Sequence, residues 1–165
     1  MQVTAFSPHD HSRCISSAIG HAQSLCATRG VRLTPVRQRV LELVWHSHQP
    51  IGAYELLASL AKEGFNSAPP TVYRALEFLS EQGLLHKLES INAYVGCSNP
   101  NTPHQGHFLL CQACHQAQEL DSEYINLALK RSADKHGFEI QRHTIEIVGT
   151  CQRCLDKSKV LESKS

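Results

Sequence analysis

The chain has 165 residues, of which 41% are hydrophobic and 19% are charged, and its net charge is +1. This length allows one domain or two small ones, and the composition is that of an ordinary globular protein. The first 97 residues carry eight Lys or Arg against seven Asp or Glu. Bulk charge therefore does not predict nucleic-acid binding, and any such function must depend on a local site.

The sequence gives no sign of a membrane segment or a secretory leader. No apolar run approaches the 18 residues needed to cross a bilayer, and the N-terminus lacks a basic segment followed by an apolar stretch. Seven cysteines without such a leader indicate a reducing cytoplasm, where cysteine usually serves metal binding or redox chemistry. We therefore expect a cytoplasmic protein without a membrane partner.

Helices dominate the first 97 residues, and a strand hairpin follows them. Thr34-Pro35 predicts a helix start with a threonine cap, and Pro69-Pro70 opens another helix. Glycines after the apolar stripes mark helix ends. The expected helices cover residues 14–29, 34–46, 53–62 and 69–82, and β-like runs cover 84–89 and 93–97. The last three of these helices, followed by a hairpin, are the pattern of a winged helix-turn-helix.

The rest of the chain predicts a linker and a second, smaller domain. The pattern indicates a linker at 98–106, strands at 107–110, 116–120 and 138–148, and a helix at 122–136. A change of phase in the last strand predicts a bend near Arg142. The fold class is therefore α+β, with a winged-helix domain at 1–97 and a small α/β domain at 107–154. Residues 1–12 and 155–165 are expected to be a flexible and a disordered tail.

Four of the seven cysteines repeat one spacing, as Cys111-x-x-Cys114 and Cys151-x-x-Cys154. Each spacing presents two thiolates from one tight turn, so two pairs can enclose one ion in a tetrahedron of sulfur. Because no coordination position stays open, the pattern predicts a structural Zn²⁺ site. Two disulfides or two buried thiol pairs are the alternatives, and a reducing location disfavours the disulfides.

A candidate DNA-contact surface lies on the helix expected at 69–82. Its apolar stripe leaves Tyr73 and Arg74 toward the opposite side, in the first turns, where a recognition helix meets base edges. Arg74 could make a bidentate contact with guanine there, and Tyr73 could bond a phosphate or pack on a thymine methyl group. A solvated helix face is the alternative, and composition alone favours it.

A second set of potential metal ligands surrounds the expected linker: His86, Cys97, His104, His107 and Glu119. Together they offer nitrogen, sulfur and oxygen, a mixed set that suits Zn²⁺, and the thiolate favours softer metals. Taken singly, each residue has an ordinary structural interpretation, such as a surface histidine or a small buried cysteine. Their placement around one linker supports the hypothesis of a metal site between two domains.

Several segments resemble the ferric uptake regulator family of bacterial metal-sensing repressors, and most closely its zinc uptake regulator branch. They are RLTPVRQRVLELV, APPTVYRALEFL, GLLHKLES, AYVGC and the two Cys-x-x-Cys pairs. The resemblance covers about residues 14–154, which is nearly the whole chain. TVYR combined with two spaced cysteine pairs is hard to match by chance.

The resemblance implies a homodimeric repressor that binds palindromic double-stranded operator DNA when its sensor site holds Zn(II), and that controls zinc uptake genes. The domain at 107–154 would then dimerise, and the four cysteines would hold structural zinc. At least one regulatory Zn(II) per subunit would bind His86, Cys97, His104 and Glu119, with His107 as the alternative ligand. DNA contacts would fall on Tyr54, Thr71, Tyr73 and Arg74. No catalytic residue and no small-molecule substrate are expected.

The segment HQGHFLLC departs from the dense His-His-Asp-His run of iron-sensing members, which weakens an iron interpretation. His143 matches a position that serves a further metal site in some members, and its role stays open. Three other functions are considered. The first is an iron- or peroxide-responsive regulator on the same scaffold, the second is a zinc hydrolase or deaminase, and the third is an interaction module that zinc stabilises and that has no DNA role. The enzymes are disfavoured because the sequence lacks H-E-x-x-H and the deaminase pattern.

Overall fold

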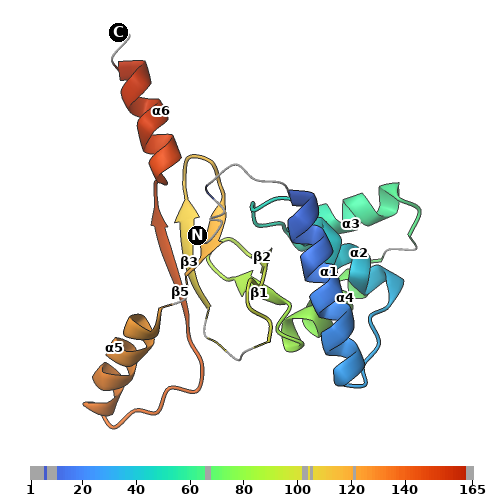
Figure 1. The fold of residues 1–165 in the computed structure, drawn as a ribbon, viewed down its shortest axis with the longest axis horizontal. Coiled ribbons are helices and arrows are strands. Elements are labelled where there is room, and N and C mark those ends of the chain that lie inside the picture. Colours follow the sequence, from blue (N-terminus) through green and yellow to red (C-terminus); the bar gives the residue numbers. More distant parts are fainter. Residues whose placement is uncertain are drawn as a thin grey trace.

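The computed structural model describes residues 6, 11–65, 68–101, 104, 106–120 and 122–162. A helical part and a β-rich part lie next to each other (Figure 1). The first contains α1 (His11–Thr28), α2 (Pro35–Trp45), α3 (Ala53–Lys62), α4 (Pro69–Glu81), β1 (Leu85–Leu88) and β2 (Ala93–Gly96). The second contains β3 (Gly106–Cys111), β4 (Ala117–Glu119), α5 (Glu123–Asp134), β5 (Thr144–Gly149) and α6 (Gln152–Glu162).

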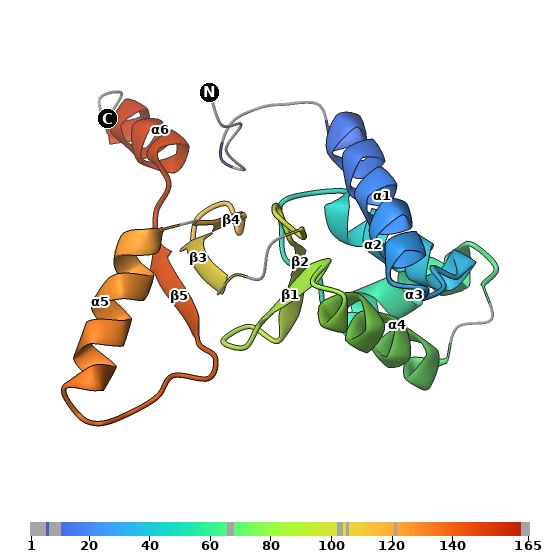
Figure 2. The ribbon, with the colours of Figure 1, turned by 60° about the horizontal axis from the view of Figure 1, so that its bottom comes forward.

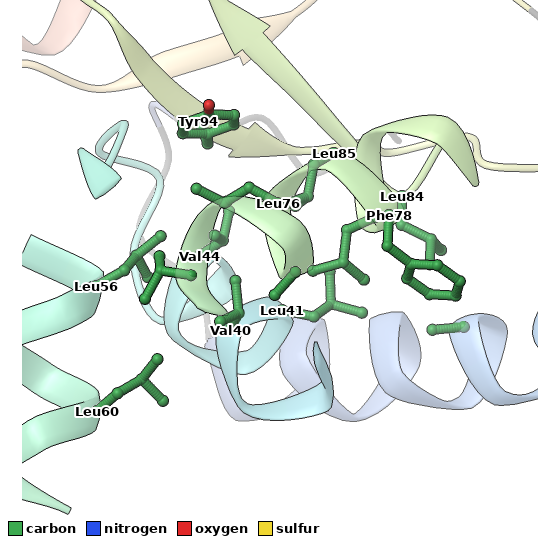
Figure 3. Packing of buried hydrophobic residues seen from close by; sticks show 14 of the residues in the cluster. Val40, Leu41, Val44, Leu56, Leu60, Leu76, Phe78, Leu84, Leu85 and Tyr94 are labelled. Carbon is green, nitrogen blue, oxygen red and sulfur yellow. The ribbon is translucent and has the colours of Figure 1, made fainter. Parts of the chain in front are cut away.

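The helix starts predicted from proline are confirmed. Thr34 caps α2 by accepting a hydrogen bond from the backbone N–H of Arg37, and prolines occupy the first turns of α2 and α4. The apolar faces of the helices meet in one core, which buries Leu41 and Leu56 completely (Figure 3). This core fixes α4 by its buried side and leaves its other side toward solvent.

β1 and β2 form the wing that follows α4. They pair as an antiparallel hairpin in which His86 lies opposite Val95 and Leu88 lies opposite Ala93. Ile51 forms a further bridge to Tyr94, which ties the hairpin to the segment before α3. This part of the chain is the expected winged helix.

The C-terminal part is a three-stranded sheet in the order β4-β3-β5. β3 runs antiparallel to β4 and parallel to β5, and α5 provides the crossover that a parallel pair requires. One side of this β-rich part lies toward the wing and α5 lies on the other side (Figure 2). The sheet therefore lies between the wing and α5.

Four sequence-based boundaries are wrong. α1 begins at His11, so residues 11–12 are helical rather than part of a tail, and the rest of that tail lies outside the described residues apart from residue 6. The last strand is confined to Thr144–Gly149. Residues 155–162 belong to α6 instead of a disordered tail, while 163–165 lie outside the described residues. Gly106, expected in the linker, already pairs with Thr144 in the sheet.

None of the described helices has both the length and the apolar character that a membrane crossing would need.

Candidate metal centres and nucleic-acid interface

Four cysteine sulfurs meet at one end of the three-stranded sheet. Cys111 ends β3, Cys114 lies in the turn to β4, and Cys151 and Cys154 lie at the start of α6. The four Sγ atoms lie within 4.8 Å of one another, and those of Cys114 and Cys151 are 3.9 Å apart. A tetrahedron with Zn–S bonds of about 2.3 Å has edges of roughly 3.8 Å, so the sulfur spacing fits zinc.

The local electrostatics of this cluster also suit a cation. Burial alone would raise the pKa of Cys111, but backbone N–H groups, first that of Cys151, outweigh it and lower the pKa to about 6. The neighbouring thiols, chiefly Cys151, raise the pKa of Cys154 to about 12. Adjacent sulfurs cannot all ionise without a positive charge between them. A metal ion held by the four sulfurs would supply that charge.

A second cluster lies where the wing meets the sheet. His86 comes from β1, Cys97 follows β2, His104 lies in the linker, and Glu119 ends β4, and their ligand atoms all lie within 4.8 Å of one another. His104 Nε2 is 2.6 Å from Glu119 Oε1 and 3.6 Å from Cys97 Sγ. The structure thus brings together the four residues that the family resemblance had singled out.

The ligand atoms of this second cluster converge on one region. His86 Nε2 is buried and lies 3.0 Å from Glu119 Oε1, yet it forms no regular hydrogen bond with any described residue. A zinc tetrahedron of nitrogen, oxygen and sulfur has edges of roughly 3.3 to 3.8 Å. The separation of 3.6 Å between Cys97 and His104 falls in this range, whereas those of 2.6 and 3.0 Å to Glu119 are shorter. One thiol, two imidazoles and one carboxylate are a ligand set that fits Zn²⁺.

The carboxylate of this cluster is held in its ionised form. Burial alone would raise the pKa of Glu119, but His86 and Ser98 outweigh it and hold the pKa at about 2. Ser98 donates to Glu119 Oε2 from its backbone N–H at 2.8 Å and from its hydroxyl at 2.6 Å. Ser98 was missed at the sequence level, although a serine next to a ligand cysteine is a reasonable candidate for orienting a ligand.

His107, the alternative ligand, lies outside this cluster. Residues alternate between the two faces of a strand, so His107 points away from the face that carries its neighbour Phe108. Its Nε2 atom is 3.1 Å from Nε2 of His143, and the two rings stack with centroids 5.3 Å apart. The structure therefore associates His104, and not His107, with the three other ligands.

Gly96 allows Trp45 to lie against the wing next to Cys97. A Cβ atom added at Gly96 would stand 2.2 Å from the indole of Trp45. We expect Gly96→Ala to displace the indole, destabilise the protein by about 1–3 kcal/mol and weaken zinc binding at the neighbouring cluster. Urea denaturation and zinc competition with a chelator would check this, with Gly149→Ala as control because nothing lies within 4 Å of a Cβ there. Equal effects of the two substitutions would contradict the prediction.

The candidate DNA-contact residues lie on the outer side of α3 and α4. Tyr54 is 75% exposed and Tyr73 is 45% exposed, Arg74 is exposed, and Thr71 is half-buried. The opposite side of α4 is fixed in the core by Val72 and its apolar neighbours. Two tyrosines and an arginine are thus presented to solvent by rigid elements.

These features define a class of metal-binding proteins with two parts. A winged helix is joined to a small α/β part that carries a four-sulfur cluster, and a mixed cluster lies at the junction of the two parts. The ferric uptake regulator family matches residues 28–148. The chain belongs to this family.

Relatives and solved structures agree with this membership. The chain is 40% identical to the zinc uptake regulation protein of Escherichia coli K12 over 139 residues, which are 84% of this chain and 81% of that protein. A solved zinc uptake regulator complexed with zinc and DNA superposes with a TM-score of 0.83 at 38% identity, covering 88% of this chain and 97% of that one.

Two solved forms of one relative differ in their likeness to this structure. Holo XcZur gives a TM-score of 0.78 at 42% identity, covering 85% of this chain and 98% of its own. Apo XcZur, also 42% identical, gives 0.50 and covers 86% of this chain and 97% of its own. At the same sequence identity, this structure is therefore more similar to the holo form of that relative than to its apo form.

Proposed function

We propose that this protein is a zinc-responsive transcriptional repressor that binds palindromic operator DNA as a homodimer and controls zinc uptake genes. The observation that carries the proposal is the mixed cluster at the junction, whose ligands come from both sides of the linker. His86 and Cys97 belong to the wing, whereas Glu119 belongs to the sheet. The relatives named zinc uptake regulators support zinc as the metal and DNA as the partner.

The two clusters have separate roles in this proposal. Cys111, Cys114, Cys151 and Cys154 would hold one structural Zn(II), and His86, Cys97, His104 and Glu119 would hold one regulatory Zn(II) per subunit. The regulatory ion, when bound, supplies bonds to both halves of the protein. The four side chains around it hold the wing against the sheet, which limits how far the winged helix can move relative to the C-terminal part.

The DNA contacts follow from the exposed side of the winged helix. Tyr73 and Arg74 on α4 would enter the major groove, and Tyr54 and Thr71 would contact the DNA next to it. A symmetric dimer reads two half-sites about 34–36 Å apart, so a fixed wing position in each subunit determines whether both helices fit. The likeness to the zinc uptake regulator complexed with zinc and DNA supports the interpretation that this structure is the DNA-competent arrangement.

The C-terminal part offers an apolar surface for the second subunit. Tyr124 and Leu127 on α5 and Ile147 and Val148 on β5 are exposed, Tyr124 to 86% and Val148 to 53%. β5 is also an edge strand of its sheet. Exposed apolar side chains on and near an edge strand support dimerisation through this part of the chain.

The pKa of Cys97 predicts the pH dependence of zinc binding at the junction. Burial, together with the Glu119 carboxylate, raises the pKa of this thiol to about 12, so the thiol is protonated at neutral pH. Zinc must displace that proton, and affinity should therefore rise about tenfold from pH 7 to pH 8 for this one proton. Calorimetry in buffers of different ionisation enthalpy should show proton release when zinc binds at the junction. Zinc binding without proton release would contradict the assignment.

A DNA-binding titration against buffered free Zn²⁺ and Fe²⁺ tests the proposed function. A fragment selected from genomic DNA should bind tightly only with Zn²⁺, and Arg74→Ala should lose that binding while keeping its zinc. The alternative, an iron- or peroxide-responsive regulator, predicts activation by Fe²⁺ instead. The presence of Cys97 in the cluster and the similarity to a zinc uptake regulation protein disfavour this alternative. A protein that selects no duplex under either metal would refute the repressor assignment.

A further inference from the structure

Glu146 forms a second connection between the sheet and the wing, separate from the metal cluster. From β5, its Oε1 accepts a hydrogen bond from the backbone N–H of Glu89 at 2.7 Å. Its Oε2 accepts from the N–H of Ser90 at 3.3 Å, and also from the Ser90 hydroxyl. One carboxylate thus satisfies two successive backbone donors in the turn between β1 and β2, more than fifty residues away in the chain.

The strand register explains why two carboxylates reach the wing. Phe108 in β3 lies opposite Glu119 on one side and opposite Glu146 on the other. Residues directly opposite each other in neighbouring strands share one face of a sheet. Glu119, Phe108 and Glu146 therefore form a row on the face toward the wing.

This row meets the wing at three points. Glu119 lies beside His86 of β1 and accepts hydrogen bonds from Ser98, just after β2. Phe108 is 1% exposed and shares an apolar cluster with Leu88 and Val95 of the hairpin. Glu146 holds the turn at the far end of the hairpin.

We propose that Glu146 is a positioning residue that sets the zinc concentration at which the protein binds DNA. This inference rests on the proposed function. Its bonds hold the wing in the arrangement that the four ligands of the regulatory cluster require. A ligand's apparent affinity depends on how much of the protein already has the competent arrangement. Glu146 raises that fraction, and with it the apparent zinc affinity, through its hydrogen bonds to the turn of the wing.

The test is the free Zn²⁺ concentration at half-maximal DNA binding, measured for the full-length dimer. Glu146→Ala should need roughly three- to tenfold more zinc while reaching the wild-type DNA affinity at saturation. Glu146→Gln keeps one oxygen that can accept from the turn, so its shift should be smaller. Glu139→Ala, which removes an exposed carboxylate elsewhere in the same domain, should show no shift.

Hydrogen exchange examines the contact itself. In the zinc-loaded wild type the amides of Glu89 and Ser90 should be protected, and Glu146→Ala should lose that protection while other strand amides keep theirs. An unchanged zinc midpoint would overturn the proposal. A loss of DNA binding at every zinc concentration would also overturn it, because a positioning residue should shift the midpoint and leave the affinity at saturation intact. A wild type without any zinc response would instead refute the proposed function, while the exchange result would still report on the contact.

Discussion

Replacing Cys97 with serine is expected to remove the zinc response of DNA binding while the dimer remains folded. Cys97 supplies the only sulfur of the cluster at the junction. A hydroxyl is a much poorer zinc ligand than a thiolate, and the junction would lose the ion that joins its two sides. If zinc favours the competent arrangement a hundredfold, that bias is about 2.7 kcal/mol. DNA affinity at a fixed low concentration of free zinc should therefore fall about 100-fold.

The matched control for this variant is Cys14→Ser, which changes a half-buried cysteine of α1 that belongs to neither cluster. Metal analysis should find one zinc per subunit in Cys97→Ser and two in Cys14→Ser. A sizing column should show the same dimer for both. A Cys97→Ser protein that binds DNA in proportion to free zinc, like the wild type, would contradict the assignment of the regulatory site.

Replacing Cys111 with serine should have a larger structural effect and unfold the C-terminal part. Cys111 is 4% exposed, and its Sγ accepts a hydrogen bond from the backbone N–H of Cys151 at 3.3 Å. The four sulfurs join the end of β3 to the start of α6, and these cysteines themselves form the small buried cluster there, with Phe6 packed against it. Structural zinc binding contributes about 10–16 kcal/mol in small zinc domains, which exceeds the stability of a typical domain.

For Cys111→Ser we expect a monomer on a sizing column, loss of both zinc ions and rapid hydrogen exchange in β3 and β5. The winged helix should keep its exchange protection, because its core contains no residue of the sulfur cluster. This pattern differs from that of Cys97→Ser, which keeps its dimer. A Cys111→Ser protein that stays dimeric and holds one zinc ion would contradict the separation of roles between the two clusters.

Sequence patterns predicted the helical part well because its signals are local. Thr34 and the prolines of α2 and α4 fix the helix starts through bonds and dihedral angles within one turn. The apolar stripe of α4 already indicated which side packs in the core. α3 was predicted with the bounds that the structure shows, Ala53–Lys62.

The errors occur where distant partners decide the structure. The alternation that begins at Phe138 predicted a long strand, but β5 begins at Thr144 because its partner β3 begins at Gly106. α6 is polar and was expected to be disordered. It starts between two cysteines of the four-sulfur cluster, and Gln152 donates a hydrogen bond to Asp156 one turn later at 2.7 Å. A fixed first turn removes the cost of helix nucleation.

The candidate metal sites could be predicted from residue types and spacing, whereas the residues that orient their ligands could not. Cysteine pairs and a His/Cys/Glu set are recognisable in a sequence, and the structure gathers both sets into clusters. Ser98 and Glu146 carry no comparable signal. Their roles depend on the register of β3 with both of its neighbours, which brings residues from opposite ends of the C-terminal part into one row.

The central claim is that occupancy of the junction cluster, with the sulfur cluster already filled, controls DNA binding. The direct measurement compares DNA affinity for protein holding one zinc per subunit and for protein holding two, at the same salt concentration. We predict that the doubly loaded dimer binds at least about 100-fold more tightly. Equal affinity of the two forms for the same operator would contradict the claim.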